Sequence, residues 1–290
     1  MTDRVVILGN SGFIGRALQA HFERSGAQVH GLASAQLDMR DSEALARLDG
    51  LVDPTCCIIV TSVVAPGSAM TPRALAENIT MAANLASYLL DHPAGRCVYL
   101  SSDAVYPMID AAVTESTETD VTALYALAKF ASERVLEHAA RAAKMPLLVV
   151  RPTAVYGPGD THNGYGPNRF VRSLVNDKTI RLFGDGEETR DHIYIDDLVR
   201  TLAALIAADQ NGLFNVATGT SYSFMQVAEI LRNVASSPVE IVRTPRQGTI
   251  THRRFDISRL RAAVPDLEFT PLEQGLGATL LAAERRVVSA

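Results

Sequence analysis

The sequence of 290 residues has little net positive charge, little lysine, few cysteines and no long apolar run. A formal net charge of −5 argues against a general nucleic-acid binder and against a protein that binds acidic membranes. No apolar run approaches about 18 residues, so we expect no membrane span. The first predicted strand begins within four residues of the N-terminus and leaves no room for a charged leader, which predicts a cytoplasmic protein.

The three cysteines, Cys56, Cys57 and Cys97, cannot all pair with one another and lack the spacing typical of metal ligands. We therefore expect a reducing compartment, buried thiols and no metal site. The remaining composition, 47% hydrophobic and 20% charged, is that of an ordinary globular protein.

The stretch Val5–Gly15 is the strongest local signal. Four apolar residues predict a buried strand, and a glycine-rich turn then leads into a helical pattern. The N-terminus of such a helix attracts a pyrophosphate if no side chain blocks its approach. The spacing Gly-x2-Gly-x2-Gly matches the dinucleotide fingerprint only in Gly12 and Gly15, so a turn that merely allows close packing is the alternative. The expected cofactor contacts in this stretch are Gly9, Ser11, Gly12, Phe13, Ile14 and Gly15.

A second predicted strand, Gln28–Ala33, ends where an Asp or Glu would select NAD. Ala33 and Ser34 stand there instead, and no arginine lies beside Ser34, so the cofactor is NAD or NADP with a mild preference for NADP. Asp38 could accept a hydrogen bond from the adenine amino group while Met39 packs on the ring. A helix cap at Asp41 is an equally good interpretation of this segment.

Further apolar runs at Cys56–Val60, Val98–Leu100 and Leu147–Val150 alternate with helical patterns at Leu75–Leu90 and Leu124–Ala143. This alternation predicts an α/β fold, a doubly wound, Rossmann-type parallel sheet with helices on both faces.

The composition changes after Arg151-Pro152, and the stretch from Gly157 to Gly166 is rich in glycine and contains proline. We expect a dinucleotide-binding domain over residues 1–156 and a smaller, mostly substrate-binding lobe over residues 157–290, with later segments able to return to the first domain. The elements expected in the lobe are strands at Thr179–Phe183 and His192–Ile195 and helices at Phe224–Val234 and Pro271–Glu284.

Tyr125 and Lys129 stand four residues apart, so a helix would place them on one face. With 8 tyrosines and three lysines in the chain, chance predicts roughly 0.08 such pairs. A neighbouring ammonium would lower the pKa of the phenol and make it a proton donor and acceptor near neutral pH. The alternative is a solvated helix face. Ser102, at the end of a predicted strand, could bind the same substrate oxygen, or it could only cap a turn.

Several motifs follow one another in a specific order: Gly9–Gly15, Ser101–Tyr106, Tyr125–Lys129, Arg151–Gly159, Phe183–His192, Asp196–Leu198 and Asp256–Ser258. In this order the chain resembles the extended short-chain dehydrogenase/reductase family, the NAD-dependent epimerase/dehydratase group that acts on nucleotide-activated sugars. The resemblance covers nearly the whole chain. It implies that Tyr125 is the acid/base, that Lys129 is its partner and a ribose ligand, and that Ser102 polarises the carbonyl. Pro152 and Val155 would line the nicotinamide.

The resemblance also implies a substrate site. Arg190 would hold the diphosphate of a nucleotide sugar, and Arg253 would supply a second clamp. Asn168 and Arg169 would reach the nucleotide, and Asp103 would contact the substrate. A surface arginine or a turn asparagine is the alternative at each of these positions except Arg190, where a functional role is favoured.

Departures from the family's sequence patterns reduce the number of candidate reactions. The 4,6-dehydratases carry a glutamate at the position where this sequence has Ala104, so the resemblance disfavours dehydration. The GDP-fucose synthases carry a cysteine at the position of Asp103. Ala154 replaces the asparagine of many 4-epimerases. The remaining reaction is hydride transfer at C4 of a nucleotide-diphosphate sugar. The first hypothesis is a nucleotide-sugar epimerase, and the second is a 4-ketoreductase similar to dTDP-4-dehydrorhamnose reductases. A non-catalytic dinucleotide-sensing regulator is a third hypothesis. The family implies a homodimer through the helices that flank Tyr125.

Overall fold

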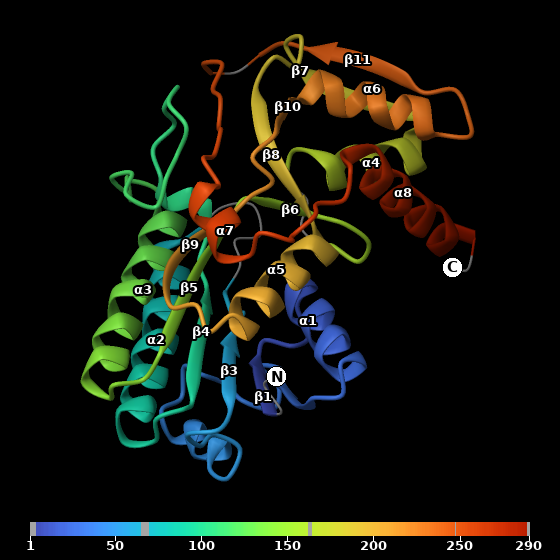
Figure 1. Cartoon of the computed structure of the whole chain (residues 1–290). Coiled ribbons are helices and arrows are strands. Elements are labelled where there is room, and N and C mark those ends of the chain that lie inside the picture. The colour runs from blue at the N-terminus through green and yellow to red at the C-terminus, as the bar shows by residue number, and fades with distance from the viewer. Residues whose placement is uncertain (1–3, 65–69, 162–163, 247, 289–290) are drawn as a thin grey trace. The chain divides into compact units, whose positions relative to one another are not determined.

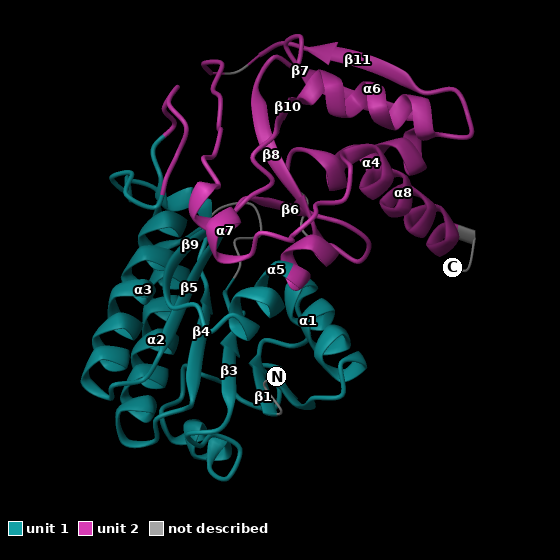
Figure 2. Ribbon diagram, viewed as in Figure 1, with its two compact units in different colours: residues 1–107, 115–152, 201–215 teal, residues 108–114, 153–200, 216–290 magenta. Residues whose placement is uncertain are grey.

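The computed structural model describes residues 4–64, 70–161, 164–246 and 248–288 (Figure 1). Its contacts divide the chain into two compact units (Figure 2). Unit 1 contains Met1–Pro107, Glu115–Pro152 and Thr201–Asn215, and unit 2 contains Met108–Thr114, Thr153–Arg200 and Val216–Ala290. The chain therefore leaves unit 1 after Pro152, four residues before the boundary that the composition suggests, and it returns to unit 1 at Thr201.

Unit 1 is built on a six-stranded sheet of order β2-β1-β3-β4-β5-β9. Its strands are β1 Arg4–Leu8, β2 Gln28–Leu32, β3 Cys57–Val60, β4 Arg96–Leu100, β5 Leu147–Pro152 and β9 Gly212–Val216. The pairings from β2 through β1, β3 and β4 to β5 are parallel. The strands β1, β3, β4 and β5 are buried on both faces, which is what a parallel sheet covered by helices requires, whereas the edge strand β2 is only partly buried.

Helices cover both faces of this sheet, so the predicted doubly wound fold is confirmed. The helices of unit 1 are α1 Phe13–Arg24, η1 Glu43–Leu48, α2 Pro72–Asp91, η2 Asp103–Val105 and α3 Leu124–Ala142, and α5 Ile195–Ala207 belongs to it from Thr201 onward. Figure 1 shows α2 and α3 together on one side of the sheet and α1 on the other. The helix α2 begins three residues before the predicted Leu75, because the Thr71 hydroxyl accepts a hydrogen bond from the Ala74 amide at 3.1 Å and Pro72 occupies the first turn.

Unit 2 contains two small sheets and four further helices. The strands β6 Ala154–Tyr156, β8 Thr189–Tyr194 and β10 Ser221–Ser223 form one sheet, and β7 Thr179–Phe183 pairs in parallel with β11 Glu240–Thr244. The helices are α4 Pro167–Asp177, α6 Phe224–Val234, α7 Ser258–Ala263 and α8 Leu272–Val288. Aromatic and aliphatic side chains of α4, α6, α8 and β7 form the core of this unit, with Phe170, Phe224 and Leu276 among its buried members.

Candidate active site

The glycines after β1 have two different roles. Gly9 has φ +90°, and a Cβ there would lie 2.8 Å from the Ser62 amide nitrogen. A Cβ on Gly15 would lie 2.2 Å from the Gly9 carbonyl oxygen, so α1 can approach the loop only because Gly15 has no side chain. Gly12 has φ −73°, and a Cβ there would come no closer than 3.3 Å to that oxygen. Close packing therefore requires glycine at Gly9 and Gly15, whereas at Gly12 the neighbouring carbonyl would have to shift by only a few tenths of an ångström to admit a Cβ.

The loop has the features that a dinucleotide pyrophosphate needs. Among the described residues no side chain caps the N-terminus of α1, and both Ser11 and Gly12 are exposed. The Asn10 side chain donates from Nδ2 to Gln19 Oε1 at 2.9 Å, whereas its buried Oδ1 has no partner within the described chain. The Phe13 side chain is buried, so only its backbone could contact a cofactor. An anion at this helix end would meet unblocked amides and the positive end of the dipole.

The segment after β2 differs from the expectation for the adenine. Met39 is only 4% exposed and packs in the hydrophobic core of unit 1. The Asp38 carboxylate accepts hydrogen bonds from the Arg40 guanidinium, which hold its pKa at about 2. Asp41 Oδ1 accepts from the Glu43 amide at 3.0 Å, but the N-cap of η1 is the next residue, Ser42, so Asp41 binds the first turn of η1 without being its cap. The Asp38 carboxylate is 41% exposed and can accept a further hydrogen bond while paired with Arg40, whereas packing of Met39 on an adenine would require the core to rearrange.

Arg47 is a residue that the sequence did not single out. Its Nη1 donates to the Gln36 carbonyl at 2.7 Å, and Gln36 Oε1 in turn accepts from the Ala33 amide at 2.8 Å. A guanidinium from η1 is thus held at the turn that follows β2. Eleven residues separate Arg47 from Gln36, so proximity in sequence gives no sign of this contact.

Unit 1 brings Ser102, Tyr125 and Lys129 together. Tyr125 and Lys129 lie one turn apart near the start of α3, and Ser102 immediately follows Ser101 at the carboxyl end of β4. The Ser102 oxygen accepts from the Ala104 amide at 3.1 Å, and its side chain is close enough to the Tyr125 phenol to favour phenolate. Ser102 therefore caps the turn and also acts on the tyrosine.

Burial controls the protonation of the tyrosine. It raises the pKa of Tyr125 to about 12, a rise opposed by the nearby Ser102 side chain and supported by the negative charge of Asp103. The prediction that a neighbouring ammonium lowers the pKa of Tyr125 is wrong for the protein without a bound ligand. The reason is desolvation, which penalises phenolate more than its neighbours stabilise it. At neutral pH Tyr125 is therefore a phenol that can donate a proton.

Lys129 is buried, with 5% of its surface exposed. Its Nζ donates to the Leu100 carbonyl at 2.8 Å and lies 5.3 Å from the centre of the Tyr99 ring. Burial lowers the pKa of Lys129 to about 8, and the charge of Glu133 opposes this fall. Lys129 thus remains mostly charged at neutral pH.

The other predicted nicotinamide contacts fall in different units. Pro152 is the last residue of β5 in unit 1, and Val155 lies in β6 in unit 2. Asn78 of α2 accepts from the Val64 amide at 3.0 Å and donates to the Val64 carbonyl at 3.1 Å, so it fixes the loop that follows β3.

Two of the predicted substrate residues converge within unit 2. Arg190 on β8 donates to the Thr251 carbonyl and hydroxyl, each at 2.8 Å, and its guanidinium lies 5.9 Å from the Phe224 ring. The Arg253 amide donates to the Thr189 carbonyl at 3.0 Å, so Arg253 lies on the segment beside the start of β8. Its side chain is 2% exposed and reaches Met108 Sδ at 3.3 Å. Two guanidinium groups on adjacent segments are suited to a diphosphate.

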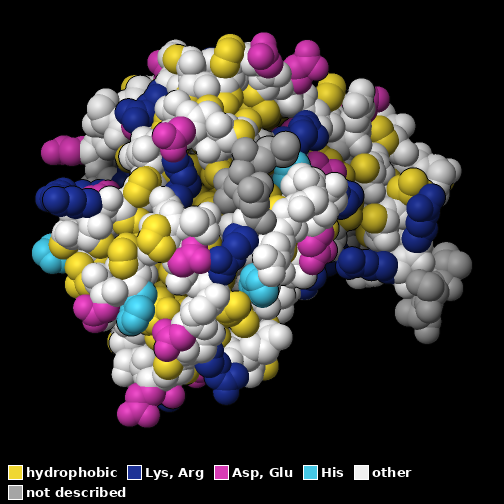
Figure 3. All heavy atoms as spheres, turned by 60° about the horizontal axis from the view of Figure 1, so that its bottom comes forward, with side chains coloured by type: hydrophobic (Ala, Val, Ile, Leu, Met, Phe, Trp, Pro, Cys, Tyr) yellow, Lys and Arg dark blue, Asp and Glu magenta, His cyan; other side chains and the backbone are white. Residues whose placement is uncertain are grey.

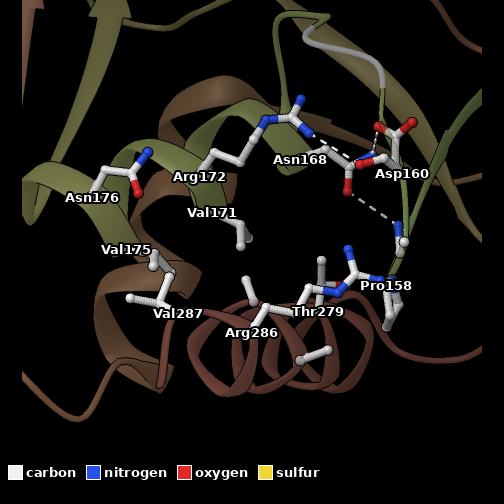
Figure 4. Close-up of a pocket in the computed structure, with 14 residues that line it drawn as sticks. Pro158, Asp160, Asn168, Val171, Arg172, Val175, Asn176, Thr279, Arg286 and Val287 are labelled. Atoms are coloured by element: carbon white, nitrogen blue, oxygen red, sulfur yellow. Dashed lines mark hydrogen bonds between the residues drawn. The ribbon is translucent and has the colours of Figure 1, made fainter. Parts of the chain in front are cut away.

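Asn168 has a structural role in this state. Figure 4 shows its side chain beside a pocket of about 260 Å³ between α4 and α8, where it accepts from the Gly157 amide at 3.2 Å and donates to Asp160 Oδ2 at 2.6 Å. Arg169 is exposed and lies 5.8 Å from the Tyr165 ring. On the face drawn in Figure 3 acidic and basic side chains are interspersed, and no basic field gathers there.

Two buried carboxylates of the motifs have roles that the sequence did not reveal. Asp191 accepts from the Thr218 amide and hydroxyl, each at 3.0 Å, and from the Gly219 amide at 2.8 Å. Asp197 accepts from the amide and hydroxyl of Thr270, each at 2.8 Å. Both fix loops within unit 2. No helix in the described ranges is long and apolar enough to cross a membrane.

The model of the NAD dependent epimerase/dehydratase family matches residues 5–217, and the chain belongs to this family. Among curated proteins it is 32% identical to a dTDP-L-rhamnose 4-epimerase of Burkholderia thailandensis over 169 residues, which cover 56% of this chain and 47% of that protein. The match therefore spans about half the length of that relative. A dTDP-4-dehydro-6-deoxy-D-allose reductase of Streptomyces bikiniensis is 26% identical over 312 residues, covering 95% of this chain and 94% of the relative.

Solved structures share the fold. A UDP-glucose 4-epimerase of Thermus thermophilus, in complex with NAD, superposes with a TM-score of 0.85 at 20% identity over 97% of this chain and 98% of that one. The protein RMD of Pseudomonas aeruginosa, complexed with NADPH, gives the same TM-score at 22% identity over 98% of this chain and 100% of that one.

Proposed function

We propose that the protein moves hydride at C4 of a nucleotide-diphosphate sugar, most directly as a nucleotide-sugar 4-epimerase. The observation that carries this proposal is the trio in unit 1: Tyr125 and Lys129 lie buried one turn apart on α3, and Ser102 at the end of β4 lies close enough to the Tyr125 phenol to oppose the rise of its pKa. Family membership and relatives that act on dTDP-sugars support it.

Each candidate residue would have a distinct role in the proposed reaction. A bound nicotinamide dinucleotide would supply the hydride acceptor and donor. Tyr125 would take the proton from the C4 hydroxyl during oxidation and return it during reduction, and Ser102 would hold the same oxygen. Lys129 would favour phenolate by its charge. Arg190 and Arg253 would bind the diphosphate, with Asp103, Asn168 and Arg169 as further substrate contacts. An epimerase returns the hydride to the opposite face of the sugar.

A 4-ketoreductase is the second candidate, because the raised pKa of Tyr125 keeps it ready to protonate a C4 ketone and a relative matched over nearly its full length is a reductase. The two activities separate in one experiment. Nicotinamide absorbance that stays with the purified protein, together with interconversion of two C4 epimers, would establish the epimerase. Stoichiometric loss of NADPH with a 4-keto nucleotide sugar would establish the reductase. Failure of both across a panel of UDP-, GDP- and dTDP-sugars would refute the proposal and favour the regulator.

The cofactor proposal is a preference for NADP. Ala33 and Ser34 present no carboxylate to repel a 2′-phosphate, and the Arg47 guanidinium is held at the same turn. A thermal-shift comparison tests it, since the better ligand raises the melting temperature more at equal concentration. Replacing Ser34 by Asp should abolish any advantage of NADPH over NADH. An NADH preference in the unaltered protein would overturn it.

We also infer a cytoplasmic homodimer. The resemblance to the extended short-chain dehydrogenase/reductase family implies a dimer through α2 and α3. The low cysteine content fits a reducing compartment. Light scattering coupled to gel filtration should give about twice the chain mass of 31.2 kDa. A monomer at micromolar concentration would contradict the inference.

A further inference from the structure

The pocket of about 260 Å³ between α4 and α8 lies entirely within unit 2 (Figure 4). The two helices share the hydrophobic core of this unit through fully buried residues such as Leu174 and Leu276. Beside that core, α8 turns Ala282 and Ala283 toward the pocket. Because packed helices stay about 8–10 Å apart, two methyl groups cannot fill the space between them. The pocket therefore follows from small residues on one face of α8.

The two ends of this pocket differ in chemistry. Figure 4 shows the guanidinium groups of Arg172 and Arg286 directed toward the end formed by the loop of residues 157–160. Val175 and Val287 lie at the opposite end. Val287 is 60% exposed, which is unusual for an aliphatic side chain at a pocket wall. The pocket thus has a cationic end and an apolar end.

Printed contacts of the loop hold the cationic end in place. Arg172 Nη1 donates to the Asp160 carbonyl at 3.2 Å, and Asn168 Nδ2 donates to Asp160 Oδ2 at 2.6 Å. Asn168 Oδ1 accepts from the Gly157 amide at 3.2 Å, so α4 is tied to both ends of the loop. The charged side chains among the lining residues are Arg172, Arg286 and Asp160. Two positive charges and one negative charge leave the lining with one net positive charge.

We propose that this pocket binds a small amphiphilic anion, a carboxylate carried on a short apolar chain. A guanidinium group matches the geometry of a carboxylate, and the valine side chains gain free energy when an apolar chain covers them. An inorganic anion would leave the apolar end uncovered, and a neutral lipid would leave the positive charge unmatched. A cavity of about 150 Å³ holds benzene, so this pocket has room for a chain of roughly eight carbon atoms. The inference does not depend on the proposed function.

The direct test is isothermal titration of the full chain with octanoate, and with octan-1-ol as the neutral probe of the same length. We expect saturable binding of one octanoate per chain, with the alcohol about tenfold weaker because it lacks the charge-assisted hydrogen bond. No saturable binding of octanoate, or equal affinity for the two probes, would overturn the proposal.

Charge at the cationic end is tested by Arg286→Met, which keeps an unbranched side chain and removes the guanidinium. The affinity for octanoate should fall about tenfold, and that for octan-1-ol should not fall. The matched control is Arg285→Met, the same change at the neighbouring exposed position of α8, which does not line the pocket. It should leave octanoate affinity within about twofold of the wild type. An equal loss in both variants would indicate attraction to the general surface charge and refute the site.

The position of the apolar chain is tested by Ala283→Leu, which fills the pocket from α8. Octanoate binding should weaken at least about tenfold, whereas Ala278→Leu, at an exposed position of the same helix outside the pocket, should leave it unchanged. Unchanged binding in a folded Ala283→Leu would refute the site. If that variant does not fold, nuclear Overhauser effects in the unaltered protein decide. They should join the octanoate methyl to the methyl groups of Val175 and Val287, and their absence at saturation would overturn the proposal.

A nucleotide competition separates this pocket from the proposed substrate site, because Asn168 lines the pocket and is also a candidate nucleotide contact. Octanoate affinity should be the same with and without saturating UDP or dTDP. Competitive displacement of octanoate by either nucleotide would assign the pocket to the substrate site and overturn the inference of a separate one. If the unaltered protein turned over no nucleotide sugar, the proposed function would fail, whereas the octanoate titrations would still decide whether the pocket binds an amphiphilic anion.

Discussion

Replacing Gly15 by Ala tests the account of the glycine-rich turn. The new Cβ would lie 2.2 Å from the Gly9 carbonyl oxygen and 2.8 Å from the Asn10 Cα, both backbone atoms that no rotamer change can move. Because ordinary contact begins near 3.4 Å, α1 must retreat by about 1.2 Å from the loop.

The cost follows from this displacement. Overpacking costs about 1–3 kcal/mol, and a clash with backbone belongs at the upper end, while Ala in a helix gains about 1 kcal/mol over Gly. The net loss is about 2 kcal/mol, or roughly 4–8 °C in the melting temperature. The same displacement moves the amides of the first turn, so affinity for a dinucleotide should fall as well.

Gly12→Ala is the matched control, because its φ is ordinary and its Cβ would lie 3.3 Å from the Gly9 carbonyl oxygen, a contact that a shift of a few tenths of an ångström relieves. We expect its melting temperature to stay within about 2 °C of the wild type, while its methyl group obstructs the anion site and lowers dinucleotide affinity. Scanning calorimetry and isothermal titration with NADH and NADPH separate the two effects. If Gly15→Ala melted and bound like the wild type, the packing argument would be refuted.

Three further predictions follow from the described contacts. Tyr125→Phe should lower turnover by about 10²–10⁴-fold with little change in stability, and full turnover in steady-state assays would exclude Tyr125 as the acid/base. Burial lowers the pKa of His192 from 6.5 to about 3, so between these pH values the unfolded chain binds a proton that the folded chain does not. The free energy of unfolding should therefore fall by about 1.4 kcal/mol for each pH unit of acidification in that window, and urea titrations of His192→Phe should lack this slope. Asp191→Ala should cost about 2–4 kcal/mol by leaving the Thr218 and Gly219 amides unpaired, whereas Asp185→Ala, at a side chain 71% exposed, should change the urea midpoint little.

The central strands of the sheet could be predicted from sequence because they are continuous apolar runs, whereas β9, Gly212–Val216, carries no such run and was not predicted. Val5–Leu8 and Leu147–Val150 are buried on both faces, and the regular alternation with helices leaves few topologies to consider. The pairing of Tyr125 with Lys129 needed only the helical period. These features depend on residues close together in the chain.

The contacts that escaped prediction join distant residues. Glu133 meets Ser101 across 32 positions and Arg151 across 18, and no pattern along the chain specifies such partners. Met108–Thr114 belongs to unit 2 because Val113 forms a bridge with Phe255, far along the sequence. The direction of the Tyr125 pKa shift failed for a related reason, since counting a neighbouring ammonium omits the desolvation that only the fold reveals.

Burial shifts the pKa values of the two central residues apart, to about 12 for Tyr125 and about 8 for Lys129. It therefore disfavours the charged form of each, and deprotonating Tyr125 at pH 7 costs on the order of 7 kcal/mol in the chain alone. Reduction of a ketone uses the phenol as it stands, so a ketoreductase meets no such cost. An epimerase must also begin from the alcohol, and for that step it needs additional positive charge near the phenol beyond that of Lys129. The oxidised nicotinamide would bring such a charge, and it would be present at every oxidation only if the dinucleotide stays bound, which is the condition that distinguishes an epimerase from a reductase.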